Sequence, residues 1–286
     1  MSDKVGLALW FSADGDDNYA SHARDAKRLC ELSRDYGVKQ FKLDGTILKN
    51  KLCEKNLISF LSETHRCAGV TFNLDITAGV RLGYLLHKEI GTIFVENRYT
   101  DWTNYYPHAV LKNLWQLSEL FPARKFQFEL LNNLRNADNY ESLAPGDELA
   151  PANYDMDWLF ASVMAANPLF WMEMQHLNEK QVEKLAAIVE IWKRERDRLY
   201  AAEVEPIGSL PDGYSFTGFN AKIGDGGYLI LLRESGEADF SYDGISSVEV
   251  LASSGGFEYE IADGRLSVHF KNPRSYAFLK YAAADR

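Results

Sequence analysis

The chain has 286 residues, of which 46% are apolar, 25% charged and 13% aromatic. That length is enough for a barrel-sized domain and a second, smaller one. The formal net charge of −10 argues against nucleic acid or an anionic membrane as the main partner, because phosphate binding needs a basic surface. The aromatic content suits the stacking of sugar rings, although aromatic residues also fill cores.

The N-terminus and the cysteines bear on where the protein resides. The segment Met1–Val5 lacks the apolar core of a signal peptide, and no apolar run is long enough to span a membrane. We therefore expect a cytoplasmic protein with no membrane partner. Cys30, Cys53 and Cys67 lack metal-ligand spacing and fall in expected helices or at a helix end, so we predict reduced, buried thiols.

Short apolar runs alternate with amphipathic stretches along the first 204 residues. The predicted strands are residues 5–11, 38–45, 70–75, 92–96, 125–132 and 168–173. The predicted helices are residues 19–36, 50–67, 108–120, 154–167 and 178–204. Such alternation predicts an α/β fold with a parallel sheet and right-handed crossovers. A closed barrel of this type has eight strands, so we predict an incomplete (β/α) TIM-type barrel of about six βα units.

After Pro206 the sequence changes to short alternating runs separated by turn signals such as Asp243-Gly244. This pattern predicts an all-β C-terminal sandwich. We therefore expect two domains, a (β/α) barrel of catalytic type over residues 1–204 and a β-sandwich over residues 205–286. The tail shows no acid cluster and no metal-ligand spacing, which favours a packing role.

Acidic residues recur at the C-terminal ends of the predicted strands, where barrels of this type carry their active sites. The residues in question are Asp44, Asp75, Glu96, Glu129 and Glu173. We single out Asp44 as a catalytic carboxylate. Because Asp-Gly is common in loops for local reasons, a turn or capping role for Asp44 is an equal alternative.

Carboxylates gathered at one rim suit glycoside hydrolysis, in which one attacks the anomeric carbon and another serves as acid and base. A separation of about 5 Å predicts retention of configuration, and one of about 6.5–9.5 Å predicts inversion. Basic residues at the same rim can hydrogen-bond sugar hydroxyls, and tryptophans can stack on the ring. These candidate contacts are Lys42, Arg81, Arg98, Trp10, Trp102 and Trp171.

Acidic rims also bind Mg²⁺ or Mn²⁺, so a metal-dependent barrel enzyme such as an isomerase is an open alternative. None of the six histidines lies at a predicted strand end beside these acids, and we predict no metal site. The segment Ala78–Gly83 lacks the lysine of a phosphate-binding loop, and no nucleophile-elbow motif occurs. We therefore predict no cofactor.

Four segments carry a resemblance to the α-galactosidase (melibiase-like) glycoside hydrolases, family thirty-six and its relatives. Leu7–Phe11 resembles the family strand Gly-Leu-Trp-Phe, with Ser-Ala where Pro-Glu usually follows. Phe41–Asp44 resembles its Lys-Trp-Asp strand. Asp75–Gly83 falls where the family has a Cys and a glycine-rich loop ending in Arg-x-Asp, of which only Arg81 matches. Ile93–Asn97 falls where the family has Ile-Trp-x-Ser-Asp.

The resemblance covers about residues 5–204 in order and extends in kind to the β-rich tail. It implies retaining hydrolysis of α-glycosidic bonds in an oligosaccharide or glycoside, with Asp44 as nucleophile and Glu96 as acid/base. Asp101 is the alternative acid/base. We also count Asn97 among the substrate contacts. The departures near Gly83 place galactose selectivity in question.

The family has a large N-terminal β domain and two further βα units before the matched region. We therefore expect a truncated relative, since an open sheet exposes its edges. It is either part of a longer protein or a chain whose barrel is completed in a homo-oligomer or by a partner chain. A rival hypothesis is a non-catalytic protein that binds carbohydrate or a protein partner through the same rim.

Overall fold

A computed structural model describes residues 6–75, 89–95, 105–130, 132–134, 141–142, 144–170 and 174–284. Its contacts divide the chain into two compact units. The first unit comprises residues 1–96 with 125–127, and the second comprises residues 97–124 with 128–286. The predicted division into domains of residues 1–204 and 205–286 stays a prediction.

The first unit alternates strands with helices, as the sequence predicts. Its strands are β1 (Ala8–Phe11), β2 (Gln40–Leu43), β3 (Thr71–Asp75) and β4 (Gly91–Val95). Its helices are α1 (His22–Tyr36) and α2 (Lys51–Ala68), with a short 3-10 helix, η1 (Asp16–Asn18). The pairs β1–β2, β2–β3 and β3–β4 are parallel. With β5 (Phe126–Leu130) and β6 (Asn167–Phe170), the six-stranded sheet has the order β1-β2-β3-β4-β5-β6.

Local signals set the limits of the two helices. The side chain of Asn50 caps α2 by accepting hydrogen bonds from the backbone N–H groups of Leu52 and Cys53. Gly37 and Gly69 end α1 and α2 with φ of 70° and 62°, a backbone region that glycine adopts without steric cost. These signals are short-range, which is why the sequence places both helices to within a few residues.

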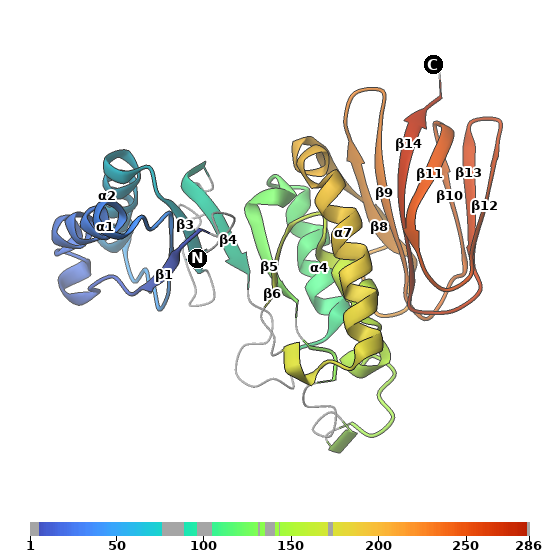
Figure 1. The fold of residues 1–286 in the computed structure, drawn as a ribbon, viewed down its shortest axis with the longest axis horizontal. Helices are drawn as coiled ribbons and strands as arrows, with labels where there is room; N and C mark the ends of the chain where they lie inside the picture. Colours follow the sequence, from blue (N-terminus) through green and yellow to red (C-terminus); the bar gives the residue numbers. More distant parts are fainter. Residues whose placement is uncertain are drawn as a thin grey trace. The chain divides into compact units, whose positions relative to one another are not determined.

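One face of the β1–β3 sheet packs against α1 and α2 to form a hydrophobic core (Figure 1). The strands supply Phe41, Leu43, Phe72 and Leu74, and the helices supply Leu29, Leu57, Phe60 and Leu61. Leu9 and Phe11 of β1 pack against this cluster. Because side chains alternate along a strand, the residues between these point to the opposite face of the sheet.

The cysteine prediction holds only in part. All three thiols are free, but Cys53 alone is buried, whereas Cys30 is half-buried and Cys67 is exposed. The expectation of a buried thiol was therefore wrong for Cys67. It lies in the last turn of α2, outside the apolar stripe that packs on the sheet.

The second unit contains three helices, α4 (Pro107–Ser118), α6 (Met156–Val163) and α7 (Glu179–Ala201). Strand β5 (Phe126–Leu130) contributes to both units, and β6 (Asn167–Phe170) precedes α7. Short 3-10 helices are η4 (Ala123–Lys125), η5 (Pro151–Asn153) and η6 (Met174–His176). Among the described residues, no helix is both long and apolar enough to cross a membrane.

The remainder of the second unit is antiparallel β-structure (Figure 1). Its strands are β7 (Glu203–Gly208), β8 (Thr217–Lys222), β9 (Gly226–Arg233), β10 (Asp239–Asp243), β11 (Ile245–Ser253), β12 (Phe257–Ala262), β13 (Arg265–Phe270) and β14 (Ser275–Ala283). One sheet has the order β11-β14-β9-β8-β7, and the other has the order β10-β13-β12. Both contribute to one core, which includes Leu229 and Leu279 from the first sheet and Leu266 and Phe270 from the second.

Strand β7 corrects the predicted helix over residues 178–204, because that helix ends at Ala201. Proline lacks a backbone N–H and occurs in sheets mainly on edge strands. Pro206 therefore argued against a strand at this position in the sequence. The strand lies at the edge of its sheet. The indole N–H of Trp115 on α4 donates to the carbonyl of Ile207 at 3.3 Å and so satisfies one edge carbonyl.

Candidate functional site

The face of the β1–β4 sheet that turns away from α1 and α2 carries polar and aromatic side chains. In the strand register Trp10 lies opposite Lys42, Lys42 lies opposite Asn73, and Asp75 lies opposite Phe94. None of these residues belongs to the core beneath the helices. We call this set, together with Asp44 at the end of β2, the strand-end face. In βα folds the C-terminal ends of the strands are where active sites form.

Lys42 is held between two aromatic rings. Its Nζ lies 4.7 Å from the centroid of the Trp10 ring and 4.4 Å from that of Phe94. Each such cation–π contact stabilises by about 0.5–2 kcal/mol, depending on how far the ammonium is desolvated. Phe94 is fully buried, whereas Trp10 is 65% exposed. The arrangement fixes a cation at the strand-end face and leaves most of an indole accessible beside it.

Asp44 and Asp75 occupy matching positions on neighbouring strands. The residues before them, Leu43 and Leu74, are register partners, and paired strands lie about 4.8 Å apart. Asp75 is 5% exposed, whereas Asp44 is half-buried. Two carboxylates therefore stand side by side at the C-terminal edge of β2 and β3.

The Asp44 side chain also has the local role that the sequence left open. Its Oδ1 accepts a hydrogen bond from the backbone N–H of Gly45 at 2.9 Å, and Gly45 has a φ of 65°. The backbone N–H of Asp44 donates to the carbonyl of Phe11 at 3.2 Å, which continues the ladder between β1 and β2. Asp44 is thus a turn residue by geometry, and that role fixes where its carboxylate lies.

Sequence reasoning missed two residues of this face, Asn73 and Phe94. The Asn73 amide donates a short hydrogen bond to the side-chain oxygen of Gln127, and Phe94 forms one side of the Lys42 site. Asn73 lies two residues before Asp75 on β3, so both side chains point to the same face of the sheet. Phe94 is the register partner of Asp75 on β4 and faces the same way. The alternation of side chains along each strand, counted from Asp75, is the sequence signal that would have identified both residues.

The other predicted site residues are placed as follows. Glu129 lies on β5 and is fully buried. The remaining candidates lie outside the described residues: Arg81, Glu96, Asn97, Arg98, Asp101, Trp102, Trp171 and Glu173. The predicted pairing of Asp44 with Glu96 and the sugar contacts assigned to these residues therefore stay predictions.

The chain has an α/β fold, in which a parallel βα sheet with a polar face at its strand ends is followed by antiparallel sheets. No protein-family model matches the chain, and no curated protein matches its sequence. The fold is nevertheless similar to that of solved glycoside hydrolases. An α-galactosidase from Lactobacillus brevis aligns with 99% of this chain and 45% of its own length, at a TM-score of 0.62 and 8% identity.

Two further solved structures show the same likeness. A GH36 α-galactosidase variant from Geobacillus stearothermophilus, in complex with 1-deoxygalactonojirimycin, has a TM-score of 0.61 at 10% identity and covers 91% of this chain and 38% of its own. An α-amylase from H. orenii has a TM-score of 0.55 at 10% identity, over 90% of this chain and 64% of its own. This chain thus spans less than two thirds of each solved chain, and at such low identity the likeness establishes the fold alone.

Proposed function

We propose that the chain is a glycoside hydrolase-like protein that binds carbohydrate at the strand-end face and cleaves α-glycosidic bonds with retention, in the manner of an α-galactosidase. The observation that carries the proposal is the gathering of Lys42, Asp44 and Asp75 beside the accessible indole of Trp10. A fold shared with α-galactosidases and α-amylases supports the substrate class.

In this mechanism Asp44 attacks the anomeric carbon and forms a glycosyl-enzyme intermediate. Glu96 protonates the leaving oxygen and then removes a proton from the water that hydrolyses the intermediate. Lys42 donates a hydrogen bond to a sugar hydroxyl, and the indole of Trp10 stacks on the apolar face of the sugar ring. Asp75 accepts a hydrogen bond from a second hydroxyl.

We further propose that the six-stranded sheet is part of a (β/α) barrel, completed in a homo-oligomer or by a partner chain. The antiparallel sheets then form a β-sandwich with a packing role, and the protein acts in the cytoplasm. Size-exclusion chromatography with light scattering tests the assembly, because a strictly monomeric chain that is fully active would refute the need for a completing partner.

The decisive experiment is hydrolysis of aryl α-galactosides by Asp44→Asn. Asparagine keeps an oxygen that can accept the hydrogen bond from Gly45, so the turn survives while the nucleophile is lost. We expect turnover to fall by at least about 10³-fold. Asp35→Asn is the matched control, because that carboxylate lies on the surface of α1 and pairs with Arg34. Unchanged turnover in Asp44→Asn would remove Asp44 from the mechanism.

The second candidate function is carbohydrate binding without hydrolysis. The hydrogen bond that Asp44 accepts from Gly45 favours it, because a purely structural turn gives the same geometry. A wild-type chain that hydrolyses no aryl glycoside, yet shows saturable heat on titration with galactose that is lost in Trp10→Ala, would establish this alternative.

A further inference from the structure

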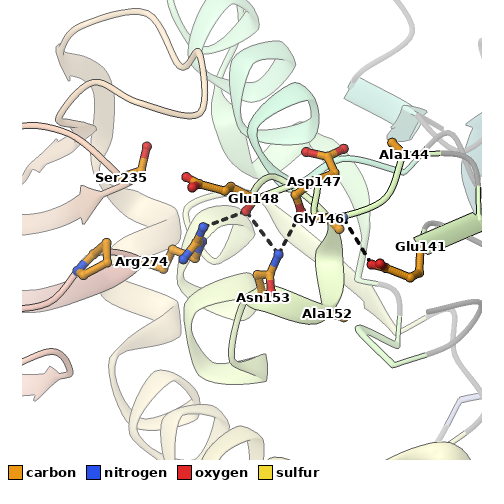
Figure 2. Close-up of a pocket in the computed structure, with 11 residues that line it drawn as sticks. Glu141, Ala144, Gly146, Asp147, Glu148, Ala152, Asn153, Ser235 and Arg274 are labelled. Carbon is orange, nitrogen blue, oxygen red and sulfur yellow. Dashed lines mark hydrogen bonds between the residues drawn. The ribbon is translucent and has the colours of Figure 1, made fainter. Parts of the chain in front are cut away.

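The second unit contains a polar cavity that the proposed mechanism does not use (Figure 2). Its volume is about 670 Å³, and one wall comes from Glu141 and from residues within 144–153. The facing wall comes from the β-structure, with Ser235 after β9 and the pair Pro273 and Arg274 before β14. All lining residues belong to the second unit, so the cavity is defined independently of the strand-end face.

A hydrogen-bond network builds the first wall. Asp147 accepts from the backbone N–H of Leu149 at 2.9 Å through Oδ1 and from the hydroxyl of Tyr106 at 2.8 Å through Oδ2. The Asn153 amide donates to the backbone carbonyls of Asp147 and Glu148, at 2.9 and 3.3 Å. This wall is therefore tied together at several points, and the Glu148 side chain extends from it as an exposed carboxylate (Figure 2).

Arg274 joins the two walls. Its Nη2 donates to the carbonyl of Glu148 at 2.7 Å (Figure 2). Its guanidinium lies 5.5 Å from the centroid of the Tyr154 ring. The backbone of Arg274 has a φ of 51°, a left-handed conformation that costs a non-glycine residue about 1–2 kcal/mol. Strained residues of this kind gather at functional sites.

The interior behind Arg274 contains a second polar group. The backbone N–H of Arg274 donates to the carbonyl of Glu234 at 2.8 Å, and the Glu234 side chain is fully buried. Within the part of the chain that the structure describes, neither Arg274 Nε nor Glu234 Oε1 has a hydrogen-bond partner. A buried polar group without a partner costs about 1–3 kcal/mol, so the region behind Arg274 carries an energetic cost in the folded state.

We propose that this cavity binds a small neutral polyhydroxylated molecule, such as a hexose, with Arg274 as donor and the carboxylates of Asp147 and Glu148 as acceptors. Sugar hydroxyls both donate and accept, which matches a lining that mixes a guanidinium with carboxylates. Three acidic residues line the cavity against one arginine, which disfavours phosphate and other anions. The apolar part of the lining comes from alanines and Pro273, and the charged groups between them favour a polar ligand.

The test follows the backbone amide signals of Ala150, Ala152 and Ser235 by NMR while the full-length chain is titrated with D-galactose or D-glucose. We expect saturable shifts at sugar concentrations up to about 50 mM, the range of weak sugar binding. The variant is Arg274→Gly, which suits the left-handed backbone and removes the guanidinium. We expect at least about tenfold weaker binding, equal to about 1.4 kcal/mol.

The matched control is Asp263→Gly, since Asp263 has a φ of 50° in the turn between β12 and β13 and does not line the cavity. Its affinity should equal that of the wild type. Equal affinity in Arg274→Gly, or no shifts at these amides, would overturn the site. Stronger shifts with spermidine or inorganic phosphate than with either hexose would overturn the ligand class.

Sugar binding in this cavity does not depend on the proposed hydrolysis. The variant Asp44→Asn distinguishes a failure of the cavity proposal from a failure of the proposed function. The shifts at Ala150, Ala152 and Ser235 should persist in Asp44→Asn, whether or not that variant hydrolyses glycosides. If the shifts disappear in Asp44→Asn, the amides report the strand-end face instead, and the cavity proposal fails while the proposed function stands.

Discussion

The two units place ionisable side chains in different surroundings. In the first unit Lys42 is held over the faces of Trp10 and Phe94, beside carboxylates at the end of a parallel sheet. In the second unit the buried carboxylate of Glu234 accepts a 2.6 Å hydrogen bond from the backbone N–H of Gly213, and burial raises its pKa to about 7. Lys42 lies at the strand-end face beside the exposed indole of Trp10, whereas the Glu234 side chain is fully buried.

The difference follows from how each sheet is covered. The helices α1 and α2 pack on one face of β1–β3, and the strand-end face lies on the opposite side, where Asn73, Asp75 and Phe94 are buried. The five-stranded antiparallel sheet packs against the three-stranded sheet and also contacts the helices, with Trp158 donating to the carbonyl of Ser275 at 3.2 Å and Tyr228 to Glu195 at 2.7 Å. The proposed site therefore lies on the sheet face that does not pack against α1 and α2.

The largest expected effect tests this contrast with two tryptophans. Trp158→Ala should cost about 3–5 kcal/mol in the free energy of unfolding, because the indole is fully buried in the second unit. Trp10→Ala should cost less than about 1 kcal/mol, because that indole is 65% exposed and loses mainly its contact with Lys42. Urea unfolding measures both. Equal losses would show that the strand-end face is a packed core.

The next effect is a pH dependence that arises from Glu234. Its pKa is raised to about 7 in the folded chain from 4.5, chiefly by burial. The folded state therefore holds a proton that the unfolded state releases, so this stabilising contribution is complete below about pH 4.5 and is lost as the pH rises to about 7. Across that window the free energy of unfolding should fall by up to about 3 kcal/mol.

Glu234→Gln should remove this pH dependence, because glutamine keeps an oxygen for the Gly213 N–H and does not titrate. Urea unfolding at pH 5 and pH 8, compared between the variant and the wild type, measures the effect. Glu237→Gln is the control, since Glu237 is an exposed residue three positions further on. A variant with the same pH slope as the wild type would refute the role of Glu234.

A smaller effect is expected at the aromatic site of the first unit. Lys42→Met keeps most of the aliphatic stem but removes the ammonium, and should lower the free energy of unfolding by about 1 kcal/mol. Under the proposed function it should also raise KM for aryl α-galactosides. Lys39→Met is the control, because Lys39 is exposed near the start of the same strand. Identical KM values for both variants would exclude Lys42 as a sugar contact.

The smallest effect compares one helix cap in each unit. Asn50 accepts two backbone hydrogen bonds at the start of α2, whereas Asn178 accepts one at the start of α7. Replacement by alanine should cost about 0.5–1 kcal/mol at either position, with the larger loss at Asn50. Thermal or urea unfolding measures both losses, and Asn50→Ser should restore most of the first. A neutral Asn50→Ala would show that packing alone fixes α2.

Several features were predictable because they depend on neighbours in sequence. The alternation of apolar runs with amphipathic stretches placed β1 to β6 and their helices, and Gly37 and Gly69 marked helix ends. The alternating runs after Pro206 gave the strands β8 to β14. Strand β7 was missed because Pro206 reads as a break, and its pairing with β8 depends on residues elsewhere in the sheet.

The sequence by itself determined that the chain is a βα unit followed by β-structure, with Asp44 and Asp75 at strand ends, since periodicity and turn residues act over a few positions. Only the tertiary structure decided which residues share a face with them. Lys42 lies between Trp10 and Phe94, and Arg274 reaches Glu148 across a cavity, because strand register and sheet packing join residues that are far apart in the chain. Such contacts have no local signature.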